Sequence, residues 1–207
     1  MLDDLRQYQV NGDKNMIEKD IIMGFNLNVA VADLCTVSLI SIASGKTPLQ
    51  VVPSFNLSQY AGRWYEFARL PNSFQDKEGK RCDFVTAEYT LRNDGKIGVV
   101  NSCRWENGET KVVKGVGRVA DKQTNSRLEV NFGPEFLGFL PFLWGSYNII
   151  ELAPDYSHAL VGSSDRKCFW ILSRERHLIE VIYKLLLEKA AEQGFDISLV
   201  RKTKQIE

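Results

Sequence analysis

The residues of this chain that could act as nucleophiles or bind a transition metal are four cysteines and two histidines. They are Cys35, Cys82, Cys103, Cys168, His158 and His177. No two cysteines form a CxxC pair, the spacing typical of zinc sites and thioredoxin-like redox centres. Two histidines are too few for a zinc site or a histidine-dependent catalytic array. The sequence therefore predicts neither a metal site nor a cofactor.

Cys82 and Cys103 flank a predicted β-hairpin. The runs CDFVTAEYTL (82–91) and KIGVVNSCRW (96–105) have strand composition, and the Asp94-Gly95 pair between them is a strong hairpin signal. The hairpin brings the two cysteines within about two residues of being opposite each other, so we predict a disulfide. Closing a loop of roughly 20 residues would stabilise the fold by about 3 kcal/mol and would indicate an oxidising compartment. Cys168 is then left as a half-buried apolar residue.

Strand-like runs separated by turn residues continue along the chain after Pro53. The eight predicted strands are 64–71, 82–91, 96–105, 110–120, 126–132, 144–153, 158–164 and 167–174. Such regular spacing, with tight turns and no intervening helices, predicts an all-β fold, an eight-stranded up-and-down antiparallel barrel. Closing the barrel removes the exposed sheet edges that would invite aggregation.

A change of periodicity marks one helix after the strands. The segment 177–194 has apolar residues at 3-4 spacing, and Gly194 is a C-cap signal. These apolar residues are Leu178, Val181, Ile182, Leu185 and Leu186. The outer wall of the barrel is the expected partner surface for this stripe, in preference to a membrane or another protein. Residues 195–200, FDISLV, are predicted to add a short final strand.

The first 45 residues differ in composition from the rest, which predicts a leader over 1–45 and one domain over 46–207. The apolar part of the leader fits a secretory signal better than a transmembrane helix, because Asp33 would cost about 3 kcal/mol at the membrane centre. A disordered extension without a targeting role is the alternative. A bacterial lipid anchor at Cys35 is disfavoured, because Asp33 and Leu34 before it do not fit a lipoprotein signal.

The charge balance argues against one class of partner. The chain carries 26 basic and 26 acidic residues, so no net field attracts it to nucleic acid. We therefore expect no nucleic-acid partner.

Three short motifs resemble those of the lipocalin family. They are Gly62-Arg63-Trp64 at the start of the first strand, Asp155-Tyr156 in the turn after the sixth strand, and Arg174 after the last. The turn departs from the family pattern in having Pro154 where threonine is usual. The phrases GRWYEFARLP and HALVGSSDRKCFWILSR also resemble the bacterial outer-membrane lipocalins related to apolipoprotein D.

The resemblance implies a barrel closed at one end by Trp64, with Arg174 packed over its indole, and holding one small ligand. Because side chains alternate along a strand, Ala68 is expected on the same side as Trp64. The residues expected to line the cavity are Glu66, Tyr89, Asn101, Tyr147 and Trp170. A buried Glu66 would need a partner or a proton, and it could receive a ligand headgroup.

In the lipocalin arrangement, the stretch GPEFLGFLPFLWG (133–145) rims the open end of the barrel. Its large apolar residues are Phe136, Leu137, Phe139, Leu140 and Phe142. Loops are usually polar, so this content indicates a role. Phe136 and Phe139 are predicted to contact the ligand as a lid. A homodimer contact, a shallow membrane contact and a plug for a narrow cavity remain open.

The function implied by the resemblance is non-enzymatic binding, storage or transport of a small lipophilic ligand. A fatty acid or a lysophospholipid is the expected ligand, and the periplasm or the bacterial outer membrane is the expected location. The alternative is a lipid-modifying, isomerase-like enzyme that uses the Cys103 thiol. A disulfide at Cys103 would remove that nucleophile, and no histidine lies near it in sequence to activate it.

Overall fold

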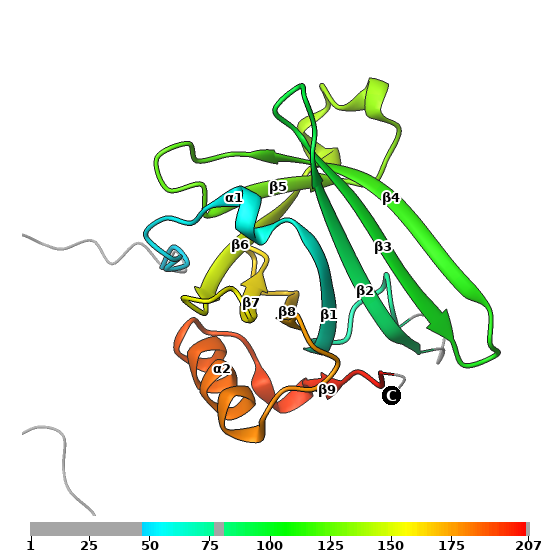
Figure 1. Ribbon diagram of the computed structural model, residues 1–207, viewed down its shortest axis with the longest axis vertical. Coiled ribbons are helices and arrows are strands. Elements are labelled where there is room, and N and C mark those ends of the chain that lie inside the picture. Colours follow the sequence, from blue (N-terminus) through cyan, green and yellow to red (C-terminus); the bar gives the residue numbers. More distant parts are fainter. Residues whose placement is uncertain (1–46, 77–80, 206–207) are drawn as a thin grey trace, which may run out of the picture. The chain divides into compact units, whose positions relative to one another are not determined.

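Eight antiparallel strands form a closed barrel in the computed structural model, which describes residues 47–76 and 81–205 (Figure 1). Strand β1 pairs with β8 on one side and with β2 on the other, and the second pairing closes the barrel. The barrel strands are β1 (Gly62–Arg69), β2 (Cys82–Leu91), β3 (Ile97–Trp105), β4 (Thr110–Val119), β5 (Arg127–Asn131), β6 (Gly145–Leu152), β7 (His158–Gly162) and β8 (Phe169–Ser173). The predicted leader, residues 1–45, lies outside the described residues.

The predicted strands are confirmed, with bounds that agree within about two residues. The turn between β2 and β3 follows from local chemistry: Gly95 adopts a φ of +77° there, a conformation that glycine reaches without steric cost. In contrast, the strand predicted over 195–200 is wrong. The Asp196 side chain accepts a hydrogen bond from the Ser198 amide at 3.1 Å and starts a 3-10 turn, η3 (Ile197–Leu199).

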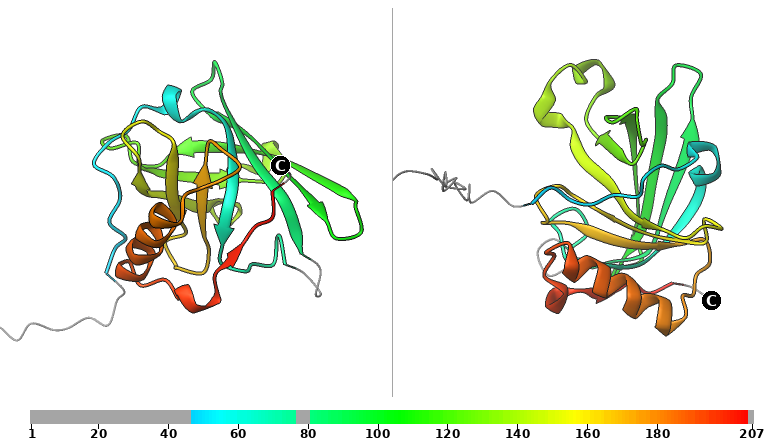
Figure 2. Two further views of the ribbon diagram at one scale, coloured as in Figure 1. Left: turned by 60° about the horizontal axis from the view of Figure 1, so that its bottom comes forward. Right: turned by 90° about the vertical axis from the view of Figure 1, so that its left-hand side faces the viewer.

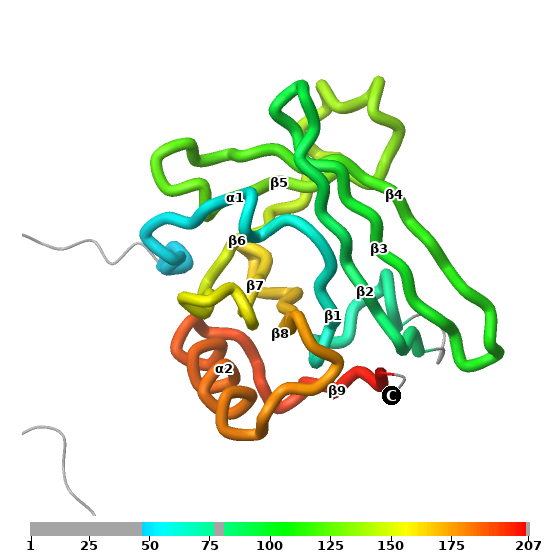
Figure 3. The backbone as a smooth tube through the Cα atoms, in the orientation of Figure 1, coloured from blue at the N-terminus to red at the C-terminus, as the bar shows by residue number. Residues whose placement is uncertain are grey.

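A ninth strand, β9 (Arg201–Lys202), follows that turn and pairs with the end of β1. The tube in Figure 3 shows the chain returning after the helix to run beside β1. The remaining elements are α1 (Leu57–Tyr60), α2 (Glu180–Glu192), η1 (Glu135–Leu137) and η2 (Pro141–Leu143). Among the described residues, no helix is both long enough and apolar enough to cross a membrane.

Side chains of the barrel form two large apolar clusters, one on each face of the wall, and a small third cluster of Cys82, Val85 and Cys103. Side chains alternate between the two faces along β7 and β8. Val161 and Leu172 belong to the inner cluster, and their neighbours Leu160 and Ile171 belong to the outer one. Both faces of these strands are therefore buried. Helix α2 covers the outer face at β7 and β8, as the two views in Figure 2 show.

The buried face of α2 agrees with the predicted stripe in part, because Leu178, Ile182 and Leu186 belong to the outer cluster or pack against it. Tyr183, Leu186 and Ala190 are buried, whereas Val181 and Leu185 are more than half exposed. Tyr183 packs edge-on against Phe67 of β1 with ring centroids 5.3 Å apart, and this contact turns its side of the helix toward the wall. Gly194 has a φ of +83° just after the helix, which confirms the predicted C-terminal signal.

A β-bulge in β1 overturns one prediction of side-chain direction. Pairing with β8 shifts between Glu66 and Ala68, so the strict alternation of the strand is broken there. Trp64 belongs to the inner cluster, but Ala68 belongs to the outer one. The prediction that Ala68 shares the side of Trp64 is therefore wrong.

Candidate functional site

The closed end of the barrel is built on Trp64, which is completely buried. Its indole Nε1 donates to the Tyr60 carbonyl at 2.8 Å, and the Arg174 guanidinium lies 3.9 Å from its ring centroid. A guanidinium stacked on tryptophan stabilises a fold by about 0.5–2 kcal/mol. Arg174 also donates to the carbonyl groups of Gln59 and Ala61, so it joins α1 to the start of β1.

The other predicted motif residues complete this end. Gly62 has a φ of +92°, and a Cβ there would lie 3.4 Å from Arg174 Nη1, which explains why glycine precedes the stacked pair. In the turn between β6 and β7, the Asp155 carboxylate accepts from the Ser157 amide at 3.0 Å. The Tyr156 hydroxyl accepts from the Asn56 amide at 2.8 Å, which fixes the chain before α1.

Three tyrosines form a hydrogen-bonded group above this base. The Tyr147 hydroxyl lies 2.7 Å from the Tyr60 hydroxyl and 2.9 Å from the Tyr89 hydroxyl. Burial raises the pKa of Tyr89 to about 12, and it raises the pKa values of Tyr60 and Tyr147 well above their usual range. All three are therefore neutral at physiological pH. Tyr60 precedes the barrel strands, and only its position four residues before Trp64 hinted at this role.

A cavity of about 1000 Å³ extends from the tyrosines toward the opposite end of the barrel. Most of its wall is apolar, with side chains such as Val85, Val99 and Leu172. The five strand residues predicted to line the cavity all do so, namely Glu66, Tyr89, Asn101, Tyr147 and Trp170. Their contact with a ligand stays a prediction.

Glu66 is 2% exposed, and protein groups already occupy its carboxylate. Arg69 Nη1 donates to Oε1 at 2.7 Å, the Thr203 hydroxyl donates to the same oxygen, and Gln75 Nε2 donates to Oε2 at 2.6 Å. Gln75 in turn accepts from the Trp170 indole at 2.9 Å. Both carboxylate oxygens of Glu66, the residue predicted to receive a ligand headgroup, are therefore already hydrogen-bonded within the protein.

Arg69 is the centre of this charged cluster and was missed from sequence. It is fully buried, and its Nε and Nη2 form a bidentate pair with Asp76 at 2.9 and 2.7 Å. Burial alone would lower the pKa of Arg69, but the two carboxylates outweigh it and raise the pKa. Strand alternation puts residues three apart on opposite faces, so only the bulge after Glu66 lets Arg69 reach it.

Two polar atoms of the wall have no hydrogen-bond partner among the described residues. They are Asn101 Oδ1 and Asn131 Nδ2, and both are buried. Asn131 still accepts from the Gly133 amide at 2.7 Å through its Oδ1. Buried polar groups are nearly always paired, so such exceptions mark places where a ligand or solvent molecule is expected to bind.

The loop between β5 and β6 borders the cavity through only part of its apolar residues. Phe142, Leu143 and Trp144 line it, but Phe136 and Phe139 do not. These two rings lie on η1 and just after it, and they are 78% and 75% exposed. In this arrangement both rings are exposed and lie outside the cavity wall, and their contact with a ligand as a lid stays a prediction.

Charged contacts fix where this loop lies. Glu135 accepts from Lys96 Nζ at 3.0 Å and from Arg92 Nη1 at 3.2 Å, both in the turn between β2 and β3. Trp144 donates its indole hydrogen to the Gly138 carbonyl at 2.7 Å, and the Arg118 guanidinium lies 4.0 Å from its ring centroid. The loop is thus held at both ends while its phenylalanines stay exposed.

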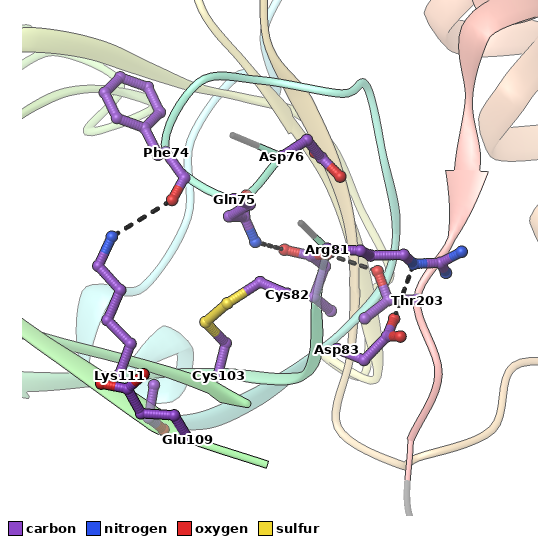
Figure 4. The surroundings of a disulfide bond; sticks show 12 residues. Phe74, Gln75, Asp76, Arg81, Cys82, Asp83, Cys103, Glu109, Lys111 and Thr203 are labelled. Atoms are coloured by element: carbon purple, nitrogen blue, oxygen red, sulfur yellow. Dashed lines mark hydrogen bonds and ion pairs between the residues drawn. A yellow bond between two sulfur atoms is a disulfide. The ribbon is translucent and has the colours of Figure 1, made fainter. Parts of the chain in front are cut away.

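The predicted disulfide joins Cys82 and Cys103 (Figure 4). In the β2–β3 register, Cys82 is paired with Trp105, two residues beyond Cys103. The Cα atoms of Cys82 and Cys103 lie 5.7 Å apart, within the usual range for a disulfide. The Cys82 amide donates to the Gln75 carbonyl, so the bridge also supports the segment that carries the charged cluster.

The free cysteine of the described part of the chain is Cys168, and it lines the cavity. Burial, aided by Asp165, raises the pKa of its thiol and so reduces the thiolate fraction. Within residues 47–76 and 81–205, no group of three or more His, Cys, Asp or Glu side chains could hold a metal ion.

Comparison with known proteins gives consistent matches. A lipocalin-like domain matches residues 55–205. Temperature-induced lipocalin-1 of Arabidopsis thaliana is 43% identical, covering 77% of this chain and 84% of the relative. The outer membrane lipoprotein Blc of Escherichia coli K12 is 34% identical, covering 81% and 91%. Apolipoprotein D of Mus musculus is 30% identical, covering 78% and 83%.

Solved structures show the same architecture. Insecticyanin from the tobacco hornworm Manduca sexta superposes with a TM-score of 0.58 at 22% identity, covering 78% of this chain and 86% of that one. Lobster apocrustacyanin A1 gives 0.57 at 20% identity, covering 73% and 81%. At these identities the two structures show the shared fold alone. Together with the domain match and the relatives, the barrel and its closed base show that the chain belongs to the lipocalin family.

Proposed function

We propose that this protein is a non-enzymatic carrier that reversibly binds a single-chain lipid, a fatty acid or a lysophospholipid, in the barrel cavity. The observation that carries the proposal is the cavity of about 1000 Å³ with a mainly apolar wall. Burying about 12 methylene groups at roughly 0.8 kcal/mol each contributes around 10 kcal/mol. Ordering and association oppose this by several kcal/mol, which leaves micromolar to nanomolar affinity.

The polar end of such a lipid belongs at the mouth. The β7–β8 loop lines the cavity there with Ser163, Ser164, Asp165 and Lys167. The Lys167 side chain is 81% exposed, and its Nζ lies 3.5 Å from the Asp165 carboxylate. A carboxylate or phosphate placed beside Lys167 keeps its contact with water, so its desolvation cost is small. The alkyl chain then extends inward along the apolar wall.

Displacement of a fluorescent fatty acid tests the carrier. Ala87→Leu adds two methyl groups and a methine on the cavity side of β2, and we expect it to weaken binding about tenfold or more. Glu88→Leu is the matched control, because Glu88 is the next residue of the strand and is exposed. Equal affinities for the two variants and the native protein, or no binding by any of them, would reject the carrier. Native mass spectrometry of protein purified from cells would identify the lipid.

The alternative, a lipid-modifying enzyme with a cavity thiol, has no specific observation in its favour. Cys103 is in the disulfide, so its sulfur is not available as a nucleophile. Cys168 does face the cavity, but its raised pKa keeps it mainly as the thiol. Turnover of a bound lipid that stops on Cys168→Ser would reverse this assignment.

The exposed phenylalanines of the 133–145 loop support a shallow contact with a lipid surface, where the carrier would take up its cargo. Phe136, Phe139 and Phe142 are each at least 75% exposed. Exposed apolar side chains are common singly, but a group of them in one loop marks a contact with a protein or a membrane. The double variant Phe136→Ser/Phe139→Ser should lower association with phosphatidylcholine vesicles. Unchanged association, with a loss of self-association in gel filtration, would assign the surface to a homodimer instead.

We also propose that the protein is exported to the periplasm or the bacterial outer membrane. The disulfide Cys82–Cys103 supports an oxidising compartment, and the Blc relatives are named outer membrane lipoproteins. Thiol counting on denatured, unreduced protein from cells should find both cysteines blocked. Free thiols at both positions would contradict export, and N-terminal sequencing of the exported form would locate the cleavage site.

A further inference from the structure

The charges of the cavity wall restrict how a lipid can enter, provided that the protein is the carrier proposed above. Among the described residues that line the cavity, Lys167 at the mouth is the only basic one, and its Nζ lies 3.5 Å from the exposed Asp165 carboxylate, which also lines the cavity. Arg69 lies behind the wall and is saturated by Glu66 and Asp76, so it offers no free positive charge to a ligand. A carboxylate pushed to the floor would therefore find no counter-ion. The buried end of the ligand must be uncharged.

Asn101 gives that buried end a polar contact. Its Oδ1 is buried without a partner, and the residue lines the cavity from β3. It is paired in register with Ala87, which is itself paired with Trp64, so these three residues form one row across the wall. Tyr89 lies two residues further along β2 on the same face, which makes its side chain a diagonal neighbour of Asn101.

The three tyrosines near Asn101 hold one hydroxyl hydrogen more than they use. Three neutral hydroxyl groups carry three hydrogens, but the group contains only the two hydrogen bonds through Tyr147. No other acceptor among the described residues takes the third hydrogen. Either partner can be the donor in each of these bonds. When Tyr60 donates to Tyr147, the third hydrogen lies on Tyr147 or Tyr89, and both of these residues line the cavity, so a ligand acceptor there selects that arrangement.

An acceptor without a donor and a donor without an acceptor thus lie on the same part of the wall. A plain alkyl chain packed against them would leave both unsatisfied, which is unfavourable in a site that excludes water. A hydroxyl group satisfies both, because its hydrogen can bond to Asn101 and its oxygen can accept from a tyrosine. A carbonyl oxygen satisfies the tyrosine donor.

We propose that the protein prefers a single-chain lipid whose buried portion carries a neutral oxygen, a hydroxyl or carbonyl group, held by Asn101 and the Tyr60–Tyr147–Tyr89 group. The acid or headgroup of this lipid stays at the mouth beside Lys167. The ligand class is therefore oxygenated fatty acyl chains rather than plain ones.

Matched pairs of acids test the proposal. Dodecanoate and hexadecanoate are compared with 12-hydroxydodecanoate and 16-hydroxyhexadecanoate, which differ from them only by a terminal hydroxyl group. For native protein, the hydroxylated acid of at least one length should bind more tightly than the plain acid of the same length. In the Asn101→Leu variant, the affinity for this hydroxylated acid divided by the affinity for the plain acid should fall about three- to tenfold, which is the effect of one hydrogen bond.

Two further variants separate this contact from general effects. Tyr147→Phe should lower the same ratio, and Ser102→Ala should not, because Ser102 is the neighbour of Asn101 on the opposite face and bonds Thr86. Lys167→Met should weaken plain and hydroxylated acids equally. If Tyr147→Phe fails to fold, Asn101→Leu carries the test alone.

The outcomes are distinguishable. If native protein binds none of the acids, the carrier function fails and this proposal with it. If it binds plain acids, but the hydroxylated acids of both lengths bind no more tightly, or their affinity relative to the plain acids does not change on Asn101→Leu, the carrier stands and the preference for oxygenated chains held by Asn101 is overturned. In that case solvent, and not the ligand, satisfies Asn101.

Discussion

Two buried polar groups lie along the wall of this barrel, and they differ in how completely their hydrogen bonds are used. In the charged cluster, Arg69 donates to Glu66, Asp76 and Thr203, and each carboxylate faces the cation. In the neutral group, three tyrosine hydroxyls share two hydrogen bonds, and Asn101 nearby has an acceptor without a partner. One group is complete within the protein and the other is not.

The difference separates two roles that sequence reasoning had merged. A titratable glutamate in a cavity is an obvious candidate for binding a ligand, but Glu66 is part of the structure of the β1 end. Asparagine and tyrosine carry no charge and attract less notice, yet they keep the unused donor and acceptor. In a lipid cavity, the incomplete neutral group is the better guide to binding, because a satisfied buried ion pair gains nothing from a ligand.

The largest effect is expected from breaking the charged cluster. Arg69→Met leaves the Glu66 carboxylate buried without its cation and leaves Asp76 with only the more distant Arg201, 3.9 Å away, so the free energy of unfolding should fall by about 3–5 kcal/mol. Urea denaturation measures it. Arg63→Met is the matched control, because Arg63 pairs with Glu88 on the exposed surface of the neighbouring strand and should cost less than about 1 kcal/mol. Equal losses would mean that burial does not distinguish the two pairs.

A smaller loss is expected from the neutral group. Tyr147→Phe removes the hydroxyl that both other tyrosines contact, so the free energy of unfolding should fall by about 1–3 kcal/mol. Tyr183→Phe serves as the control, since its hydroxyl makes no hydrogen bond within the described residues and its removal should cost about 0.5 kcal/mol or less. A Tyr147→Phe loss as large as that of Arg69→Met would contradict the division into a complete and an incomplete group.

Asn101→Leu should raise the free energy of unfolding, whereas the two preceding variants lower it. Replacing a buried amide that lacks a partner by an apolar side chain removes a desolvation penalty, so the ligand-free protein should gain about 1 kcal/mol of stability in the same urea assay. Asn148→Leu is the control, because Asn148 Nδ2 donates to the Gly162 carbonyl at 2.9 Å and its loss should destabilise the fold. Destabilisation by Asn101→Leu would show that Asn101 is already satisfied.

The two groups should respond to opposite ends of the pH scale, with no effect between about pH 5 and 10. Burial would raise the pKa of Asp76, but its bonds to Arg69 outweigh this and lower it. Asp76 therefore stabilises the fold at pH values above the pKa that it has in the unfolded chain, and this stabilisation is lost as the pH falls below about 4. The tyrosine pKa values are raised by burial, so their stabilisation is present below about pH 10 and lost above it. Thermal unfolding measured across pH gives the loss of stability at the acid end and at the alkaline end, and absorbance at 295 nm follows the ionisation of tyrosine. A fall in the melting temperature near neutral pH would contradict these assignments.

The strands, their order and the disulfide could be predicted because each depends on neighbours in sequence. The turn at Gly95 sets the β2–β3 register, and that register brings Cys82 and Cys103 together. The stacking of Arg174 on Trp64, 110 positions apart in the chain, came only from the resemblance to a family. Alternation from Trp64 then placed Glu66 on the cavity wall, as it does in the structure.

The remaining features depend on contacts that no local pattern encodes. The β-bulge at Glu66 turns Ala68 outward and lets Arg69 meet two carboxylates, and nothing in the run WYEFARLP announces it. The predicted apolar stripe of α2 is only partly buried, because Tyr183 and Ala190 pack on the outer cluster beside Leu186, and neither of them belongs to the predicted stripe. The unused acceptor of Asn101 becomes visible only once every neighbouring donor has been placed.

The segment that follows β9 has a consequence for how the protein is made. Thr203 donates to Glu66, Gln205 donates to the Glu66 and Val85 carbonyls, and the Lys204 amide donates to Asp83. Residues 137 positions apart are thus needed to complete one cluster. Because a ribosome delivers the chain in order, Glu66 and Arg69 must wait through the synthesis of nearly the whole barrel before Thr203 emerges. The order of translation therefore makes this corner of the barrel the last to become fully bonded.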